Sequence, residues 1–317
     1  MVNLSRRDML AVSGAALLAA CSGRAGQGGL TIGFQKNGLL LLAQSRGQVT
    51  ARFAAEGKPP PTWVEFPSGP PMMEAMAAGS LDFGAVGESP PIFAQAAGQP
   101  IRYVAVQPLS GQGAAIVVPP ASSIRAIADL KGRKVAFVKG SSAHLVTAKA
   151  LEKAGLDFAD IDVAYLNPAD AAGALASGAI DAWAIWDPFL AIAQAQQGAR
   201  AIVTGADLPP SDAFFVGSAA ATETKADYLH ILLKALREEA AWAARNPKEA
   251  VAIVAKQSGL PAQIVATSLR RGRFAAEPMA AQTTARQQSN ADLFAKLGII
   301  AKPVSIEAAV WHDSVKG

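Results

Sequence analysis

The stretch Ser-Ile-Arg-Ala-Ile-Ala-Asp-Leu-Lys-Gly-Arg-Lys-Val-Ala-Phe, residues 123–137, begins a second series of strand and helix patterns in this chain. A first series precedes it, from about residue 30 to residue 113. Strands that alternate with helical stretches are typical of parallel sheets that are covered by helices on both faces. Because the series starts again in mid-chain, we predict two α/β lobes rather than one.

Working outward from this stretch, short β-like runs alternate with helical segments on both sides. The predicted strands are Leu30–Phe34, Thr62–Phe66, Asp82–Val86, Ile101–Val106, Ala114–Val118, Lys134–Val138, Asp162–Leu166, Ala182–Trp186, Ala201–Thr204 and Phe214–Ser218. The predicted helices between them include Pro71–Ala78, Ile92–Ala97, Ala143–Ala154 and Ala169–Ser177. From Glu223 onward the pattern is helical only, with an apolar stripe at i, i+3, i+4 and i+7 spacing between Tyr228 and Trp242.

This order of elements predicts lobes that share the chain in an interleaved way. Residues 30–113 and 214–317 are assigned to lobe 1, and residues 114–213 to lobe 2. Two crossings, near Gly111–Ala115 and Ser211–Phe215, would join the lobes. The length of 317 residues agrees with this, since at roughly 150 residues per domain it predicts two domains or two lobes.

Composition excludes several classes of protein. With 51% hydrophobic and 17% charged residues, the chain is too apolar for a disordered protein. Its net charge of +4 is scattered, with no basic run longer than Arg270-Arg271-Gly272-Arg273, so we expect no nucleic-acid partner. The three histidines, His144, His230 and His312, are too far apart for a local metal motif, and we expect no metal and no cofactor.

The first 20 residues have the pattern of an export leader. Arg6 and Arg7 precede a twelve-residue apolar run, Met9–Ala20, which is too short to span a membrane core that needs roughly 20 residues. The paired arginines resemble a twin-arginine signal. The run ends Leu-Ala-Ala-Cys at Cys21, the only cysteine, which resembles a bacterial lipobox. We therefore predict residues 1–20 as a signal peptide, residues 21–29 as a lipidated tether, and a membrane attachment through that anchor only.

Several strand-to-helix corners could hold an anion, because a helix N-terminus offers free N–H groups and about half a positive charge. Gln35 directly follows the first strand and could donate through its amide. Gly87, Glu88 and Ser89 form a second corner, in which Ser89 could equally be a simple helix cap.

The third and fourth corners follow later strands. Gly140, Ser141 and Ser142 place hydroxyl and N–H groups at one point, with His144 one turn into the helix. This corner lacks the Lys-Ser/Thr ending of a nucleotide-binding loop. At the fourth corner Trp186 and Asp187 precede a proline, and the tryptophan could either line a ligand site or pack as a core residue.

In order and spacing, these stretches resemble the periplasmic binding proteins of aliphatic sulfonate ABC transporters, within the nitrate/sulfonate/taurine-type group. The matching segments are Ile32–Lys36, Val64–Pro70, Ala77–Gly84, Gly87–Gly98, Ala128–Phe137, Lys139–His144 and Trp186–Phe189. The resemblance extends from Leu30 to about Trp311.

The resemblance implies a type II periplasmic binding protein, with two Rossmann-like lobes and a ligand cleft between them. It implies a monomeric lipoprotein of the periplasm or cell envelope that captures a small anion, an alkanesulfonate, and delivers it to an ABC permease. Carried over by position, the ligand-binding residues are Gln35, Gly87, Glu88, Ser89, Gly140, Ser141, Ser142, His144, Trp186 and Asp187. We place Glu88 at the tail end of the ligand, because a carboxylate beside the sulfonate would repel it.

Three alternatives stay open at this stage. Nitrate, taurine, another small organic anion or a thiamine-precursor pyrimidine could be the ligand. A sensor lipoprotein would present its ligand to a receptor instead of a permease. An enzyme on this fold is the third, but the related sulfinate desulfinases use a cysteine nucleophile, and the only cysteine here, Cys21, lies in the lipobox. A serine hydrolase would need Ser141 or Ser142 with His144, at a spacing that matches no nucleophile elbow. We therefore predict that the chain is not an enzyme.

Overall fold

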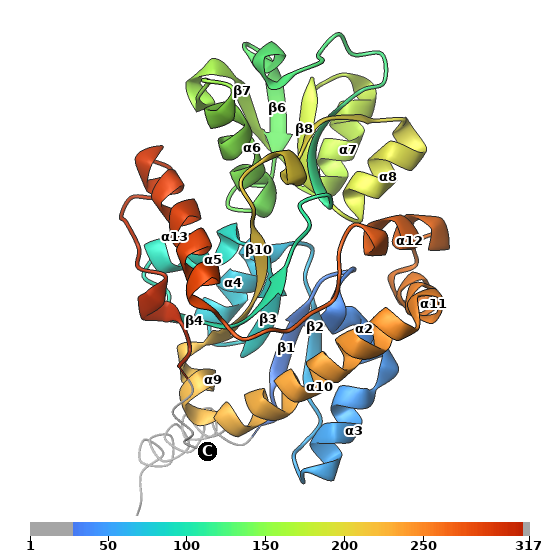
Figure 1. The fold of residues 1–317 in the computed structure, drawn as a ribbon, viewed down its shortest axis with the longest axis vertical. Helices are drawn as coiled ribbons and strands as arrows, with labels where there is room; N and C mark the ends of the chain where they lie inside the picture. The colour runs from blue at the N-terminus through green and yellow to red at the C-terminus, as the bar shows by residue number, and fades with distance from the viewer. Residues whose placement is uncertain (1–27, 313–317) are drawn as a thin grey trace, which may run out of the picture.

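The structure, a computed structural model, describes residues 28–312. Two five-stranded sheets form the frame of the molecule (Figure 1). The first sheet has the order β2-β1-β3-β10-β4. Its strands are β1 (Thr31–Phe34), β2 (Thr62–Glu65), β3 (Phe83–Val86), β4 (Ile101–Pro108) and β10 (Asp212–Ser218). The second sheet has the order β7-β6-β8-β5-β9. Its strands are β5 (Ala114–Val118), β6 (Lys134–Phe137), β7 (Asp162–Tyr165), β8 (Ala182–Trp186) and β9 (Arg200–Thr204).

We call each sheet with its helices a lobe. The first lobe contains α2 (Leu39–Arg46), α3 (Gln48–Ala55), α4 (Gly69–Ala77), α5 (Ser89–Ala96), α9 (Ala219–Thr224), α10 (Ala226–Arg245), α11 (Pro247–Ser258), α12 (Ala262–Arg270) and α13 (Ala281–Lys296). The second contains α6 (Ser142–Lys153), α7 (Pro168–Ser177) and α8 (Phe189–Gln197). Short 3₁₀ turns are η1 (Ile127–Leu130), η2 (Phe158–Asp160), η3 (Gly205–Asp207) and η4 (Glu307–Ala309).

The expectation of purely parallel sheets is wrong for one strand in each sheet. Strand β10 runs antiparallel to β3 and β4, and β5 runs antiparallel to β8 and β9. These are the two strands that the chain enters directly after crossing between the lobes. The other strands end at the side that faces the opposite lobe, so a strand that starts at this side must run the other way. The α/β fold class is confirmed, with mixed sheets.

The crossings are short. The chain passes from the first sheet to the second between Pro108 and Ala114, and returns to the first sheet between Thr204 and Asp212. Strand β10 begins at Asp212, two residues before residue 214, where the sequence predicted the second part of lobe 1 to begin. The proposed domain limits, 30–113 plus 214–317 and 114–213, stay a prediction, as do the signal peptide and tether, because Arg6, Arg7 and Cys21 lie outside the described residues.

Apolar side chains cover both faces of each sheet, as alternation along a strand requires. In β4, Val104 joins the cluster under α2 and α10, whereas Tyr103 joins the cluster under α5 and α13. In β5, Ile116 and Val117 face opposite sides of the second sheet in the same way. The two buried faces fix the register of each strand, because a slip by one residue would expose its core residues.

Helix α10 carries the predicted stripe. Leu232 and Leu236 are fully buried, and the polar exception in the stripe, Glu239, is buried as well and accepts a hydrogen bond from Arg46 Nε at 2.7 Å. Asn246 precedes α11, where an asparagine side chain commonly caps the helix, but its side chain makes no such cap here. Its Nδ2 atom donates backward to the Trp242 carbonyl at 2.9 Å, so the side chain closes α10 instead of opening α11.

Candidate ligand-binding cleft

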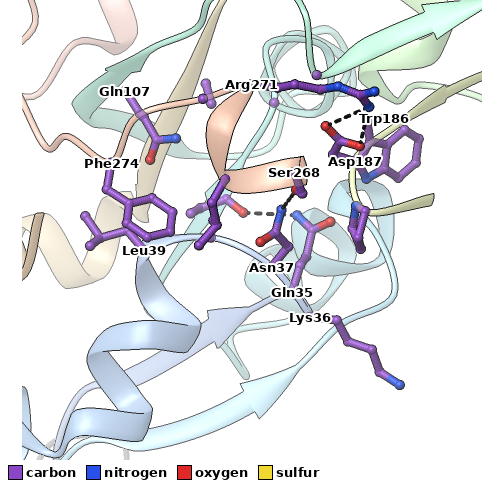
Figure 2. A pocket seen from close by; sticks show the side chains of 18 of the residues that line it. Gln35, Lys36, Asn37, Leu39, Gln107, Trp186, Asp187, Ser268, Arg271 and Phe274 are labelled. Atoms are coloured by element: carbon purple, nitrogen blue, oxygen red, sulfur yellow. Dashed lines mark hydrogen bonds and ion pairs between the residues drawn. The ribbon is translucent and has the colours of Figure 1, made fainter. Parts of the chain in front are cut away.

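A cavity of about 1210 Å³ lies where the lobes face each other, at the carboxyl ends of several strands. Loops after β1, β3 and β8 line it, together with the start of α6 and the segment after α12. Ligands of open α/β sheets bind at such strand ends, where helix N-termini point toward them. Figure 2 shows side chains from both lobes turned toward one space, while Lys36 points away from the other labelled residues.

The corner before α6 is built by a left-handed glycine. Gly140 has φ of +73°, a conformation that glycine adopts without a Cβ penalty, and its N–H donates to His144 Nδ1 at 3.2 Å. Ser141 and Ser142 both line the cavity. Ser141 Oγ donates to the Val138 carbonyl at 2.7 Å, and Ser142 Oγ donates to Glu88 Oε2 at 2.9 Å. The predicted serine corner therefore reaches the cleft, but Gly140 itself is buried behind it.

His144 does not reach the cavity. Its ring is 2% exposed and lies among aromatic rings, with centroids 4.9 Å from Phe137 and 5.7 Å from Phe93. Burial, together with the nearby Lys139 ammonium, lowers the pKa of His144 to about 4. The imidazole is thus neutral near pH 7, which leaves Nδ1 free to accept the Gly140 N–H. In this structure His144 holds the corner in place from the core side.

The corner before α5 lies directly opposite. Gly87 lines the cavity, whereas Glu88 and Ser89 are buried behind it. The alternative in which Ser89 caps α5 is wrong, because Ser89 is the first residue of the helix and Glu88 occupies the cap position. Burial raises the pKa of Glu88, against the opposing effects of its own backbone N–H, of Lys149 and of Ser142. Within residues 28–312, Ser89 Oγ is a buried hydroxyl with no hydrogen-bond partner.

The loop after β1 adds amide groups. Gln35 Nε2 donates to the Ala85 carbonyl at 3.2 Å, which holds this side chain against β3. Asn37 Nδ2 donates to Ser268 Oγ at 2.7 Å and so ties the loop to α12. Gln35 lines the cavity as predicted, and Asn37 joins it there (Figure 2).

At the end of β8, Trp186 and Asp187 line the cavity from the second lobe. The Trp186 ring meets Phe189 edge-on at 6.2 Å between centroids. Asp187 Oδ1 accepts from the Ala191 N–H at 3.1 Å, and its backbone N–H donates to the Gly113 carbonyl at 2.8 Å. Burial raises the pKa of Asp187, and Arg271 opposes that rise.

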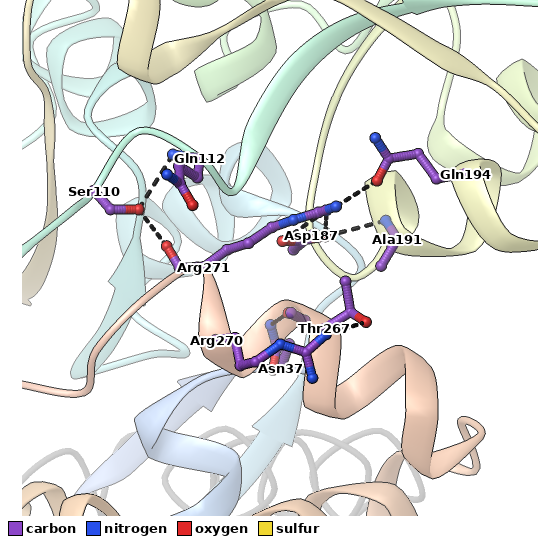
Figure 3. A network of polar contacts seen from close by, with 10 residues as sticks. Asn37, Ser110, Gln112, Asp187, Ala191, Gln194, Thr267, Arg270 and Arg271 are labelled. Carbon is purple, nitrogen blue, oxygen red and sulfur yellow. Dashed lines mark hydrogen bonds and ion pairs between the residues drawn. The ribbon is translucent and has the colours of Figure 1, made fainter.

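Sequence reasoning missed Arg271. Its Nη1 atom lies 3.1 Å from Asp187 Oδ1, its Nη2 atom donates to Gln194 Oε1, and its carbonyl accepts from Ser110 Oγ (Figure 3). The pair joins the segment after α12 to the second lobe and is well shielded, with side-chain exposures of 20% and 7%. The signal was present in the run Arg270–Arg273, all of which lines the cavity. In the sequence alone, this run indicates only that the basic charge is too scattered for a nucleic-acid partner.

Comparison with known proteins agrees with this architecture. A family model described as NMT1/THI5 like matches residues 65–250.

The chain belongs to this family.

It is 40% identical over 316 residues to an aliphatic sulfonates-binding protein of Escherichia coli (strain K12), covering 99% of this chain and 97% of that one. A Bacillus subtilis (strain 168) protein with the same name is 31% identical, covering 95% and 92%. The crystal structure of the periplasmic aliphatic sulphonate binding protein SsuA from Escherichia coli has a TM-score of 0.82 at 39% identity, covering 91% and 94%. The alkanesulfonate-binding protein SsuA from Xanthomonas axonopodis pv. citri, bound to MOPS, has a TM-score of 0.85 at 36% identity, covering 92% and 100%.

These matches confirm the predicted family and fold. The relatives above 30% identity are binding proteins, so this member of the family is a solute-binding protein and not an enzyme. A structure of the desulfurization enzyme DSZB also superimposes, with a TM-score of 0.63 at 16% identity, which shows a shared fold only. Among the described residues no helix is both long and apolar enough to cross a membrane, and no cluster of His, Cys, Asp and Glu could hold a metal ion.

Proposed function

We propose that this protein captures an aliphatic sulfonate in the cleft between its lobes and delivers it to an ABC permease. The observation that carries the proposal is the cavity itself, in which the N-terminus of α6, the Gln35 amide and the Arg271 guanidinium line the same space. The names of the two relatives and two crystal structures support the same ligand class for this chain.

The sulfonate head is assigned to the corner of Ser141 and Ser142. The first N–H groups of α6 have no partner inside the helix, and the helix dipole favours an anion there. Gln35 completes the donor set from the first lobe, with Ser89 and Gly140 supporting the corner from behind. A hydrogen bond to a charged group contributes about 1.5–3 kcal/mol, and micromolar affinity needs about 8 kcal/mol, so four or five such bonds are enough.

The alkyl tail is assigned to the apolar part of the cleft. Trp186 and Phe189 line it from the second lobe, and Phe66, Leu109 and Phe274 from the first lobe and its crossing segment. A cavity of about 1210 Å³ is large for nitrate or another inorganic anion, since pockets of roughly 300–1,000 Å³ already hold drug-sized ligands. This favours an organic anion with a tail of some length.

Export and anchoring complete the proposal. We infer a leader with a twin-arginine pattern at Arg6 and Arg7, cleavage before Cys21 and lipid modification of that cysteine, so that a monomer is held at the periplasmic face of the envelope. The support is the sequence pattern and the periplasmic location in the name of the Escherichia coli structure. Labelling with a radioactive fatty acid tests it, because the Cys21→Ser chain should incorporate none.

A ligand panel tests the function. We expect C2–C8 alkanesulfonates to raise the melting temperature of the Cys21→Ser chain, because a ligand that binds only the folded state stabilises it by mass action. Ser141→Ala combined with Ser142→Ala should weaken every sulfonate by a similar factor. Trp186→Ala should weaken long sulfonates more than short ones. A response to nitrate, taurine, sulfate or bicarbonate without one to any alkanesulfonate would refute the proposal.

A further inference from the structure

One hydroxyl of the cleft lies between the cavity and a buried acid. Ser142 is the first residue of α6 in the second lobe, and it lines the cavity. Its Oγ atom is 2.9 Å from Oε2 of Glu88, which belongs to the first lobe and is 3% exposed. The contact therefore joins the lobes at the corner where the proposed sulfonate head binds.

Packing holds the hydroxyl in this place. A Cβ atom added to Gly87 would lie only 1.8 Å from Ser142 Oγ, so the serine oxygen occupies the space beside that glycine. A side chain at residue 87 would displace the hydroxyl from Glu88. The absence of a side chain at residue 87 is what lets Ser142 touch the cavity and the acid at once.

The chemistry of this contact depends on a proton. A serine hydroxyl has a single hydrogen to donate, and a sulfonate can only accept. If Glu88 is ionised, it takes that hydrogen, and Ser142 presents oxygen lone pairs to the cavity. If Glu88 is protonated, its own O–H can donate to Ser142 Oγ across the same 2.9 Å, and the serine hydrogen is free to point into the cleft.

We propose that Glu88 is a positioning residue that acts through Ser142: the sulfonate binds best when Glu88 is neutral and the Ser142 hydroxyl donates into the cleft. The inference rests on the proposed function and replaces our earlier placement of Glu88 at the ligand tail. The carboxyl reaches the head corner through one hydroxyl, and Glu88 itself is not among the residues that line the cavity.

The surroundings of Glu88 support a neutral state. From α6, the Lys149 ammonium lies near but donates to the Pro209 carbonyl at 2.9 Å and to Ser211 Oγ at 2.7 Å. From β10, Asp212 is held by Arg286 of α13 at 2.6 Å.

The remaining contacts of Glu88 carry no charge. Gln287 of α13 donates to the Glu88 carbonyl at 2.6 Å, which leaves the carboxyl group untouched. Among the described residues, Ser142 is the only side chain that hydrogen-bonds the Glu88 carboxyl group. Burial is the largest influence and raises the pKa of Glu88, and Asp212 adds slightly to this rise, while the backbone N–H of Glu88, the Lys149 ammonium and the Ser142 hydroxyl oppose it.

The proposal makes binding depend on pH. If the bound state needs neutral Glu88, the pKa of Glu88 is higher in the complex than in the free protein, and binding takes up protons. Affinity should then rise as pH falls and level off once free Glu88 is protonated. The ligand itself contributes nothing, because an alkanesulfonate is the anion of a strong acid and stays ionised throughout.

Isothermal titration of 1-pentanesulfonate into the Cys21→Ser chain between pH 5 and 9 tests this, in two buffers of different ionisation enthalpy. This pH range includes the pKa values of buried glutamates, which reach about 8–9. We expect affinity about tenfold higher at the acid end, the size of one hydrogen bond to a charged group, with proton uptake at the alkaline end. Glu88→Gln is the matched control, because its amide can donate to Ser142 Oγ at any pH. It should bind as tightly as the wild type does at low pH, with a flat profile.

Ser142→Ala separates the hydroxyl mechanism from plain repulsion by a charged Glu88. It should bind more weakly and lose the pH dependence. A full pH dependence in Ser142→Ala would overturn the proposal in favour of charge repulsion. Binding with a flat profile and no proton uptake in the wild type would overturn it while leaving the proposed function intact. No binding of any alkanesulfonate at any pH would overturn both.

Discussion

The cleft is bridged at two corners whose chemistry differs. At one, the neutral hydroxyl of Ser142 meets the buried carboxyl of Glu88 beside Gly87. At the other, the guanidinium of Arg271 pairs with the carboxylate of Asp187. Burial raises the pKa of both acids, but only Asp187 has a cation bonded to it.

This difference gives the two corners different roles. A guanidinium and a carboxylate attract each other at neutral pH, so the Arg271 corner holds the two lobes together independently of the ligand. The Ser142 corner contributes little attraction between the lobes, but it determines whether a bound anion faces the hydrogen or the lone pairs of the Ser142 hydroxyl. We therefore expect steric changes at the hydroxyl corner to affect binding most, and charge changes at the Arg271 corner to act through the contact between the lobes.

Gly87→Ala should have the largest effect. Its Cβ would lie 1.8 Å from Ser142 Oγ, and overpacking of this kind costs about 1–3 kcal/mol, which corresponds to as much as about a hundredfold in affinity for 1-pentanesulfonate. Gly113→Ala is the matched control at the other corner, because its Cβ would lie at an ordinary 3.5 Å from Asp187 Oδ2. Equal losses in the two variants, measured by calorimetry, would show that the corners do not differ.

His144 tests the support behind the hydroxyl corner. Its pKa is 6.5 when unperturbed and about 4 in the folded protein, so between these pH values His144 is protonated in the unfolded chain and neutral in the folded chain. The stability that His144 contributes should be fully present above pH 6.5 and should decline as the pH falls toward 4. From pH 7 to pH 5 this amounts to about 2 kcal/mol of unfolding free energy.

In urea titrations, His144→Gln should lack this part of the acid loss, because its amide oxygen can still accept the Gly140 N–H but does not titrate. If the variant and the wild type lose the same stability over this range, His144 is not the group responsible.

Arg271→Gln should have the smallest of the three effects. It leaves the largely buried Asp187 without its cation, and with partial solvent screening we expect about a tenfold loss of affinity. Arg273→Gln in the same loop is the control, since its pair with Glu277 is 65% and 46% exposed and such pairs contribute at most about 1 kcal/mol to stability. If calorimetry finds the two arginine variants equally weakened, the net charge of the loop matters and the Arg271–Asp187 pair does not.

Local patterns were enough for most of the fold. Every strand of both sheets overlaps a run that the sequence predicted, because alternation in β4 or the stripe in α10 needs only neighbouring residues to be recognised. Strand direction was not accessible in this way. Whether β5 and β10 run parallel or antiparallel depends on where each crossing enters its sheet, which no local pattern encodes.

The site was predicted less completely. Gln35, Ser141, Ser142, Trp186 and Asp187 line the cavity, as expected from their positions at the ends of strands. His144 and Ser89 are equally polar and equally close in sequence, yet their side chains are buried beside the site. Helix rotation and packing decide this, and the residue type does not reveal it.

Residue type and order thus established the α/β class, the interleaved lobes and the corners at which an anion could bind, because each is set by short-range hydrogen bonding and periodicity. Folding in three dimensions established which groups meet across the cleft. Glu88 and Ser142 are 54 residues apart, and Asp187 and Arg271 are 84 apart. Local patterns cannot encode contacts at such separations, because they form only when the lobes pack against each other, and burial then shifts the pKa of each acid.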